Sequence, residues 1–108
     1  DGPAVRARWL GLGGLEASLD AMRFLLESVE TQELGAELLR DLAGDGEAPR
    51  SRVLEEGGLA AAVTAMGRHS ASQRAQLLGC TLIQRLAGGG AEARQRVAAA
   101  GGVEATLE

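Results

Sequence analysis

The sequence predicts an all-α fold, a right-handed α-solenoid of about two and a half three-helix repeats with a period of 44 residues. Two observations predict it. Aromatic residues make up only 2% of the chain, whereas Ala, Leu and Gly dominate it. Strands need β-branched and aromatic side chains, and Ala, Leu, Glu, Arg and Gln are residues that favour helices. The second observation is an internal repeat.

The repeat is marked by a glycine pair, Gly13-Gly14, which returns as Gly57-Gly58 and as Gly101-Gly102, each time 44 residues later. Laying residues 8–51 on residues 52–95 without a gap matches many positions, and chance does not align so many. The matched pairs are Arg8/Arg52, Leu15/Leu59, Ala17/Ala61, Ala21/Ala65, Met22/Met66, Ser28/Ser72, Gln32/Gln76, Leu34/Leu78, Gly35/Gly79, Leu38/Leu82, Leu42/Leu86, Ala43/Ala87, Gly44/Gly88, Gly46/Gly90 and Arg50/Arg94.

A third copy begins at residue 96 and breaks off at residue 108. The repeats therefore divide the chain into units of about 8–51 and 52–95 and a partial unit of 96–108. We expect residues 1–108 to form a single repeat segment. The start at Asp1 without a Met predicts a processed chain or a piece of a longer one, and the open ends of the stack predict further repeats of a longer solenoid, or a partner that covers an end.

The first helix of each unit is predicted to be short, over about residues 49–56, with counterparts over 3–12 and 91–100. Pro49 falls near its first turn, where a missing N–H costs nothing, and Gly57-Gly58 ends it.

The second helix is predicted over about residues 59–69, because Leu59, Val63 and Met66 have the i, i+4, i+7 spacing of one buried stripe. The same stripe reads Leu15, Leu19, Met22 and Leu26 in the first copy, and begins as Val103 and Leu107 in the third.

The third helix is predicted over about residues 72–87, with Leu78, Leu82 and Leu86 buried and with Leu77, Ile83 and Ala87 beside them. Its first-copy stripe is Leu34, Leu38 and Leu42, with Leu39 and Ala43 beside it. Gly35 and Gly79 recur in mid-helix, where glycine is unfavourable, so we expect a close helix crossing there. A single unit cannot bury its stripes alone, so successive units are predicted to stack.

The stretch from Arg52 to Leu59, followed by a second helix ending near Met66 and a third closing in Leu86-Ala87-Gly88, resembles the armadillo repeat family. The resemblance covers nearly the whole chain and implies armadillo-like three-helix repeats. Armadillo proteins that capture extended peptides, such as importin-α and β-catenin, place a Trp and an Asn on the third helix. The matching positions here hold Glu37 and Thr81 for the Trp, and Asp41 and Arg85 for the Asn.

What remains of the resemblance is a concave face made by the third helices. At helical spacing this face presents a mostly acidic stripe and then a partly basic one, which we interpret as a surface for a charged protein partner, such as a basic helix or loop. An ordinary solvated helix face is the alternative. The candidate partner-binding residues are Glu30, Glu33, Glu37, Asp41, Arg74, Leu77, Thr81 and Arg85.

Function is accordingly predicted to be a non-enzymatic protein–protein interaction scaffold within a larger assembly. The alternative is a regulatory or autoinhibitory repeat domain of a larger multidomain enzyme, and a third hypothesis is peptide-cargo transport in the importin manner. The glycine strings do not match a phosphate-binding loop, and the chain has no Lys. One histidine, His69, and one cysteine, Cys80, are too few for a metal site. We expect no catalytic residue, cofactor or metal, with Cys80 a buried thiol and His69 a surface residue or helix cap.

Composition narrows the partners further. A formal net charge of -4 and a pI near 5.0 argue against nucleic acid, which calls for a basic face. No apolar run approaches the roughly 20 residues of a membrane span, so membrane insertion is not expected. Because Cys80 is the single cysteine, the sequence favours a reducing compartment and predicts an intracellular, cytoplasmic location.

Two aromatic residues complete the predictions. Trp9 occupies the slot that Val53 and Val97 occupy in the later copies, which predicts a core position or a plug over the first end of the stack. Phe24 aligns with Arg68, so the first unit is more apolar there. We expect its own loop, residues 26–29, to cover Phe24, with a docking patch as the alternative.

Overall fold

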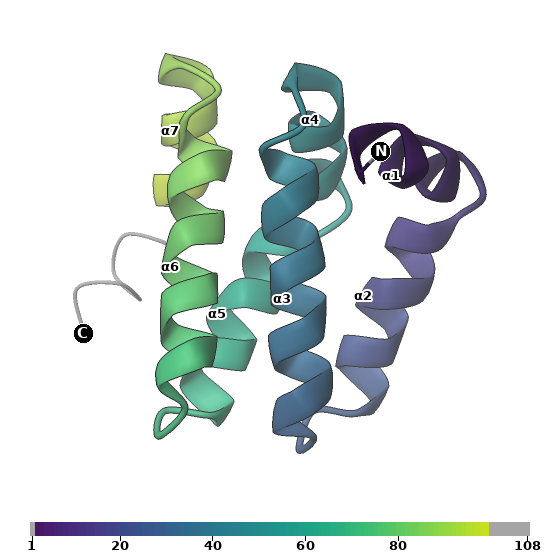
Figure 1. Cartoon of the computed structure of the whole chain (residues 1–108). Coiled ribbons are helices and arrows are strands. Elements are labelled where there is room, and N and C mark those ends of the chain that lie inside the picture. The colour runs from purple at the N-terminus through teal and green to yellow at the C-terminus, as the bar shows by residue number, and fades with distance from the viewer. Residues whose placement is uncertain (1, 100–108) are drawn as a thin grey trace.

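The computed structural model describes residues 2–99, and over this range it contains seven helices and no strand (Figure 1). The predicted all-α class is therefore confirmed for these residues. The helices are α1 (Gly2–Gly11), α2 (Gly14–Phe24), α3 (Val29–Ala43), α4 (Glu47–Glu55), α5 (Gly58–Arg68), α6 (Gln73–Ala87) and α7 (Ala91–Ala99).

The seven helices follow the predicted repeat, with α1 to α3 in the first unit, α4 to α6 in the second, and α7 opening the third. Each helix begins and ends within about two residues of its predicted bounds, the usual uncertainty of helix ends. The predicted second helix of the third unit, with Val103 and Leu107, lies outside the described residues.

The turns repeat as closely as the helices. Gly13 and Gly57, which precede α2 and α5, have φ angles of 86° and 102°, in the left-handed region that favours glycine. Ser28 and Ser72 are the N-caps of α3 and α6, and their Oγ atoms accept hydrogen bonds from the backbone N–H three residues later at 3.2 and 3.0 Å. The sequence repeat thus encodes repeated local backbone structure.

Two matched glutamines join the second helix of each unit to the third. The Nε2 of Gln32 donates to the carbonyl oxygens of Met22 and Leu25, at 2.9 and 3.0 Å. In the second unit Gln76 makes the same two bonds with Met66 and His69, at 2.9 and 3.1 Å. In each pair the first carbonyl lies in the last turn of the second helix, where the helix itself offers no donor, and the second belongs to the C-cap residue. Each glutamine, itself a residue of the third helix, therefore caps the end of the second helix of its unit.

The predicted close crossing at the mid-helix glycines is confirmed. A Cβ at Gly35 would overlap the side chain of Met22, and a Cβ at Gly79 would overlap that of Met66. Gly14 is packed in the same way against Trp9, which is half-buried against the core as predicted. In each unit the methionine of the second helix thus packs on the glycine of the third, and this contact lets the two helices approach closely.

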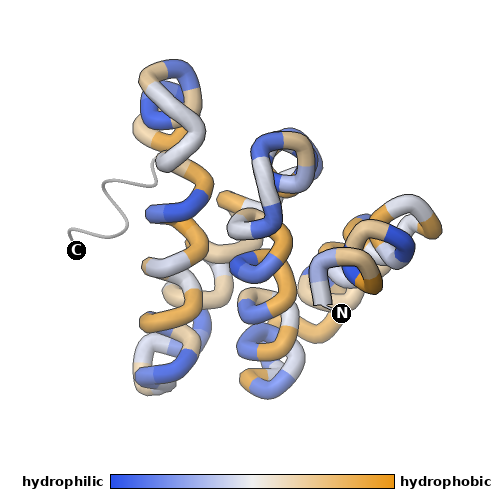
Figure 2. Tube along the Cα trace, turned by 45° about the horizontal axis from the view of Figure 1, so that its top comes forward, coloured by the Kyte–Doolittle hydropathy of each residue, from blue (hydrophilic) through white to orange (hydrophobic). Residues whose placement is uncertain are grey.

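The core runs from one unit into the next. It contains Leu15, Leu19 and Met22 from α2 and Leu39 and Leu42 from α3, and in the second unit Val53, Leu59, Leu82, Ile83 and Leu86. Within it α3 packs along α6, and the two lie side by side in Figure 1. Apolar and polar residues alternate along both helices in Figure 2, as expected for helices with one buried side.

Two predicted stripe positions are wrong in detail. Leu34 is 64% exposed, although its counterpart Leu78 is only 4% exposed. Leu77, predicted to flank the stripe of α6, is 68% exposed. The reason for the first difference is position in the stack, since α6 has α3 beside it and no preceding third helix stands beside α3 in the described residues. Helical spacing alone does not include that neighbour.

Candidate interaction surface

The eight residues predicted to bind a partner lie on α3 and α6, four on each helix. Because these helices run side by side, the two stripes form adjoining parts of one surface (Figure 1). Glu30, Arg74, Leu77 and Arg85 are exposed, and the other four, Glu33, Glu37, Asp41 and Thr81, are half-buried.

Half of the acidic stripe is bonded to α6. The Oγ of Ser72 donates to Oε2 of Glu33 at 2.7 Å, and Nη2 of Arg74 donates to Oε1 and Oε2 of Glu37 at 2.7 and 3.2 Å. Both contacts cross from the second unit to the first. The carboxylates that the sequence suggested for a basic partner are therefore also engaged in holding α3 to α6, each exposed pair contributing up to about 1 kcal/mol.

Near the other end of α3, Nη1 of Arg85 donates to the carbonyl oxygen of Arg40 at 2.8 Å. This carbonyl lies in the last turn of α3, where a cation is favoured. Asp41 accepts from Nε and Nη2 of the adjacent Arg40, at 3.2 and 3.1 Å. Acidic and basic side chains are consequently paired beside each other around Leu77 and Thr81, and the surface is not divided into the acidic and basic parts that the sequence suggested. That these residues bind a partner stays a prediction.

Most of the side-chain contacts between units share one direction, with the donor in the second unit and the acceptor in the first. The exception is Nη2 of Arg23, which donates to the carbonyl oxygen of Glu56 at 3.4 Å. Beyond those already named, Arg52 pairs with Glu16 at 3.0 Å, Arg68 pairs with Glu27 at 2.8 Å, and Nε2 of His69 lies 2.7 Å from the carbonyl oxygen of Leu26. The interface between units thus combines an apolar core with polar and charged contacts between complementary groups.

The predicted roles of His69 and Cys80 fit their places only in part. His69 is the C-cap residue of α5, as one of its two predicted roles requires. Cys80 is half-buried, although its counterpart Ala36 is 1% exposed. The prediction of a fully buried thiol is therefore wrong, because α6 is the last third helix among the described residues and has no following third helix beside it there.

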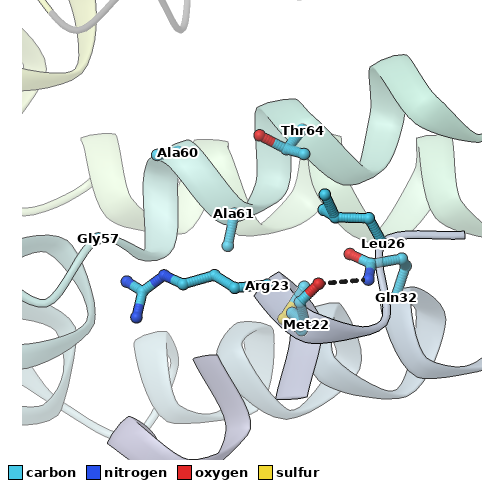
Figure 3. A pocket seen from close by; sticks show the side chains of 8 residues that line it. All are labelled: Met22, Arg23, Leu26, Gln32, Gly57, Ala60, Ala61 and Thr64. Atoms are coloured by element: carbon cyan, nitrogen blue, oxygen red, sulfur yellow. Dashed lines mark hydrogen bonds between the residues drawn. The ribbon is translucent and has the colours of Figure 1, made fainter. Parts of the chain in front are cut away.

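A separate pocket of about 280 Å³ opens between α2, α3 and α5 (Figure 3). Its lining is largely apolar, and its polar side chains are those of Arg23, Gln32 and Thr64. The eight lining residues include no carboxylate, histidine or cysteine, so the pocket offers no acid or base, and the hydroxyl of Thr64 has no base among them to activate it. They are Met22, Arg23, Leu26, Gln32, Gly57, Ala60, Ala61 and Thr64.

An ion pair held by two hydrogen bonds lies between α1 and the turn that joins α3 to α4. Nε and Nη2 of Arg6 donate to Oδ2 and Oδ1 of Asp45 at 2.6 and 2.7 Å. This two-bond contact lowers the pKa of Asp45 and raises that of Arg6. It fastens α1 to the turn between α3 and α4, a structural task that the sequence pattern did not reveal.

Comparison of the chain with family models, with curated proteins and with solved structures gave no match. Among residues 2–99, no helix is long and apolar enough to cross a membrane.

Proposed function

We propose that this chain is a non-enzymatic scaffold for protein–protein interaction, an armadillo-like solenoid segment that meets its partner on the face of α3 and α6. The observation that carries the proposal is the repetition of a whole structural unit. The glycine turns, serine caps, glutamine bonds and Met–Gly crossings recur at a spacing of 44 residues. Stacked units of this kind produce extended surfaces on which other proteins dock.

The distribution of exposed side chains supports this face. Leu77 is 68% exposed and lies between the paired Arg74 and the half-buried Thr81, one turn along α6. An exposed leucine ringed by polar groups is the arrangement found at docking sites, where an apolar centre is surrounded by a polar rim. The neighbouring pair of Glu37 and Arg74 presents charges of both signs to a partner.

The test is capture of partners on immobilised chain followed by measurement of the affinity of each retained protein. Leu77→Asp is expected to weaken binding at least about tenfold, because it places a charge at the apolar centre. Val5→Asp is the matched control, since Val5 is 63% exposed but lies on α1, away from this face. Equal effects of the two substitutions would show that the α3–α6 face is ordinary solvated surface.

A second arm separates surface charge from stability. Exchanging the pair as Glu37→Arg with Arg74→Glu keeps opposite charges facing each other, so the contact between α3 and α6 is expected to persist. The charge pattern seen by a partner is reversed. We expect weaker binding with an unchanged helical spectrum, and unchanged binding would remove these charges from the proposed site.

A further inference from the structure

The outward side of α2 and α3 exposes two large apolar side chains, those of Leu34 and Phe24, and the second unit buries the counterpart of Leu34. Leu34 is 64% exposed and Phe24 87% exposed, so the first unit's own loop does not cover Phe24 as predicted. A pocket of about 220 Å³ lies beside Leu34, between the two helices. We name this surface the end face and define it by Ser18, Ala21, Phe24, Thr31, Leu34 and Leu38.

The second unit shows what kind of element covers such a face. Five end-face positions recur 44 residues later as Ala62, Ala65, Ala75, Leu78 and Leu82, all at most 4% exposed, because α3 packs there. On α3 the residues Ala36 and Ala43 are 1% and 2% exposed, whereas their α6 counterparts Cys80 and Ala87 are half-buried. A helix with small residues two turns apart therefore fits the end face.

Neither of the two basic positions beside the buried face of the second unit is basic beside the end face. In the second unit Arg68 and Arg74 reach back to Glu27 and Glu37 of the first. The corresponding positions of the first unit are Phe24 and Glu30. A helix that lies on the end face as α3 lies on α6 would thus meet a carboxylate where α3 meets a guanidinium. Charge complementarity calls for a basic residue on that helix in place of Glu37.

A second copy of this chain lacks that residue. If the α6 side of one copy stacked on the end face of another, Thr81 would stand opposite Glu30 and Leu77 opposite Ser28, at the places where Glu37 and Glu33 bond to Arg74 and Ser72. No such pair of the internal interface would be reproduced. Self-stacking is therefore disfavoured relative to a partner with a basic helix.

We propose that the end face binds an amphipathic helix of a partner protein, one with small residues two turns apart and a basic residue next to the first of them, opposite Glu30. This surface shares only Glu30 with the α3–α6 face. The proposal stands or falls separately from the proposed function, because Leu34 tests the end face alone and Leu77 tests the α3–α6 face alone.

The probe is a labelled peptide of residues 28–44, the chain's own α3 with its caps, carrying Glu37→Lys, and the control peptide has the native Glu37. Binding to the 108-residue chain is followed by fluorescence anisotropy. The lysine peptide is expected to bind about fivefold more tightly than the native peptide, because attraction to Glu30 replaces repulsion. The Glu30→Lys chain should invert this preference.

Leu34→Ser is expected to weaken both peptides at least about tenfold. Val5→Ser, which changes an exposed apolar side chain on α1, should leave both unchanged. Failure of either peptide to bind, or a charge preference that survives Glu30→Lys, would overturn the proposal. Sedimentation showing a dimer of the chain that Leu34→Ser dissociates would also overturn it, since the occupant would then be a second copy.

Discussion

The glutamine that joins the second helix to the third offers a prediction with an internal control. Gln32 is 1% exposed, and its Nε2 donates to two carbonyl oxygens at the end of α2, those of Met22 and of the C-cap residue Leu25. Gln76 makes the same two bonds but is half-buried. Substitution by Met at each position removes the donor and keeps a side chain of similar length and flexibility.

The two substitutions differ in what happens to the abandoned carbonyls. A buried polar group left without a hydrogen bond costs about 1–3 kcal/mol. Gln32→Met is therefore expected to cost about 2–3 kcal/mol, because the carbonyl of Met22 loses its donor in a buried place, whereas that of Leu25 keeps the N–H of Ser28. Water reaches the site of Gln76, so Gln76→Met should cost about 1 kcal/mol. For a domain of this size, about 1 kcal/mol corresponds to about 4–8 °C in Tm.

The assay is urea unfolding followed by far-UV circular dichroism on the two variants and the parent chain. A lower midpoint at constant slope would show that stability changed without a change in the surface exposed on unfolding. Equal costs at the two positions, or a larger cost at Gln76, would refute the reasoning, because burial would then not set the strength of this contact.

Two other predictions concern backbone and charge. Gly57→Ala should destabilise the chain by about 1–2 kcal/mol, because Gly57 has a φ of 102°. Gly67→Ala should stabilise it by up to about 1 kcal/mol, because Gly67 lies in helix α5 with no atom near the added methyl group. Thermal unfolding of both variants checks the two signs. Asp45→Asn should lower Tm at neutral pH, and because contact with Arg6 lowers the pKa of Asp45, the difference from the parent should shrink below about pH 4 and vanish below the lowered pKa; a constant difference across this range would contradict that role.

Much of the fold was predictable because the repeat carries its own internal comparison. Ser28 and Ser72, Gln32 and Gln76, and Gly35 and Gly79 all appear as matched pairs in the sequence. The crossing glycines were predictable from their helix-breaking nature. The glutamine bonds were not, although a polar residue repeated inside an apolar stripe was the signal that marked them.

Contacts between units were harder to predict, because they join positions that the repeat does not equate. The bond from Arg74 to Glu37 and that from Ser72 to Glu33 pair unlike positions of adjacent units. Reading each helix by itself therefore produced an acidic stripe and a basic stripe, although the packing of α3 along α6 joins them. The ion pair of Arg6 and Asp45 was not predictable either, because the fold brings together two residues that are 39 positions apart in the sequence.

In the repeat, a residue of the third helix is buried by the unit that packs before it. Leu34 and Leu78 occupy the same repeat position and are 64% and 4% exposed. Urea unfolding of Leu34→Ala and Leu78→Ala measures the consequence most directly. The stacking account predicts a loss of about 2–4 kcal/mol for Leu78→Ala and less than about 1 kcal/mol for Leu34→Ala. Equal losses, or a larger one at Leu34, would contradict it.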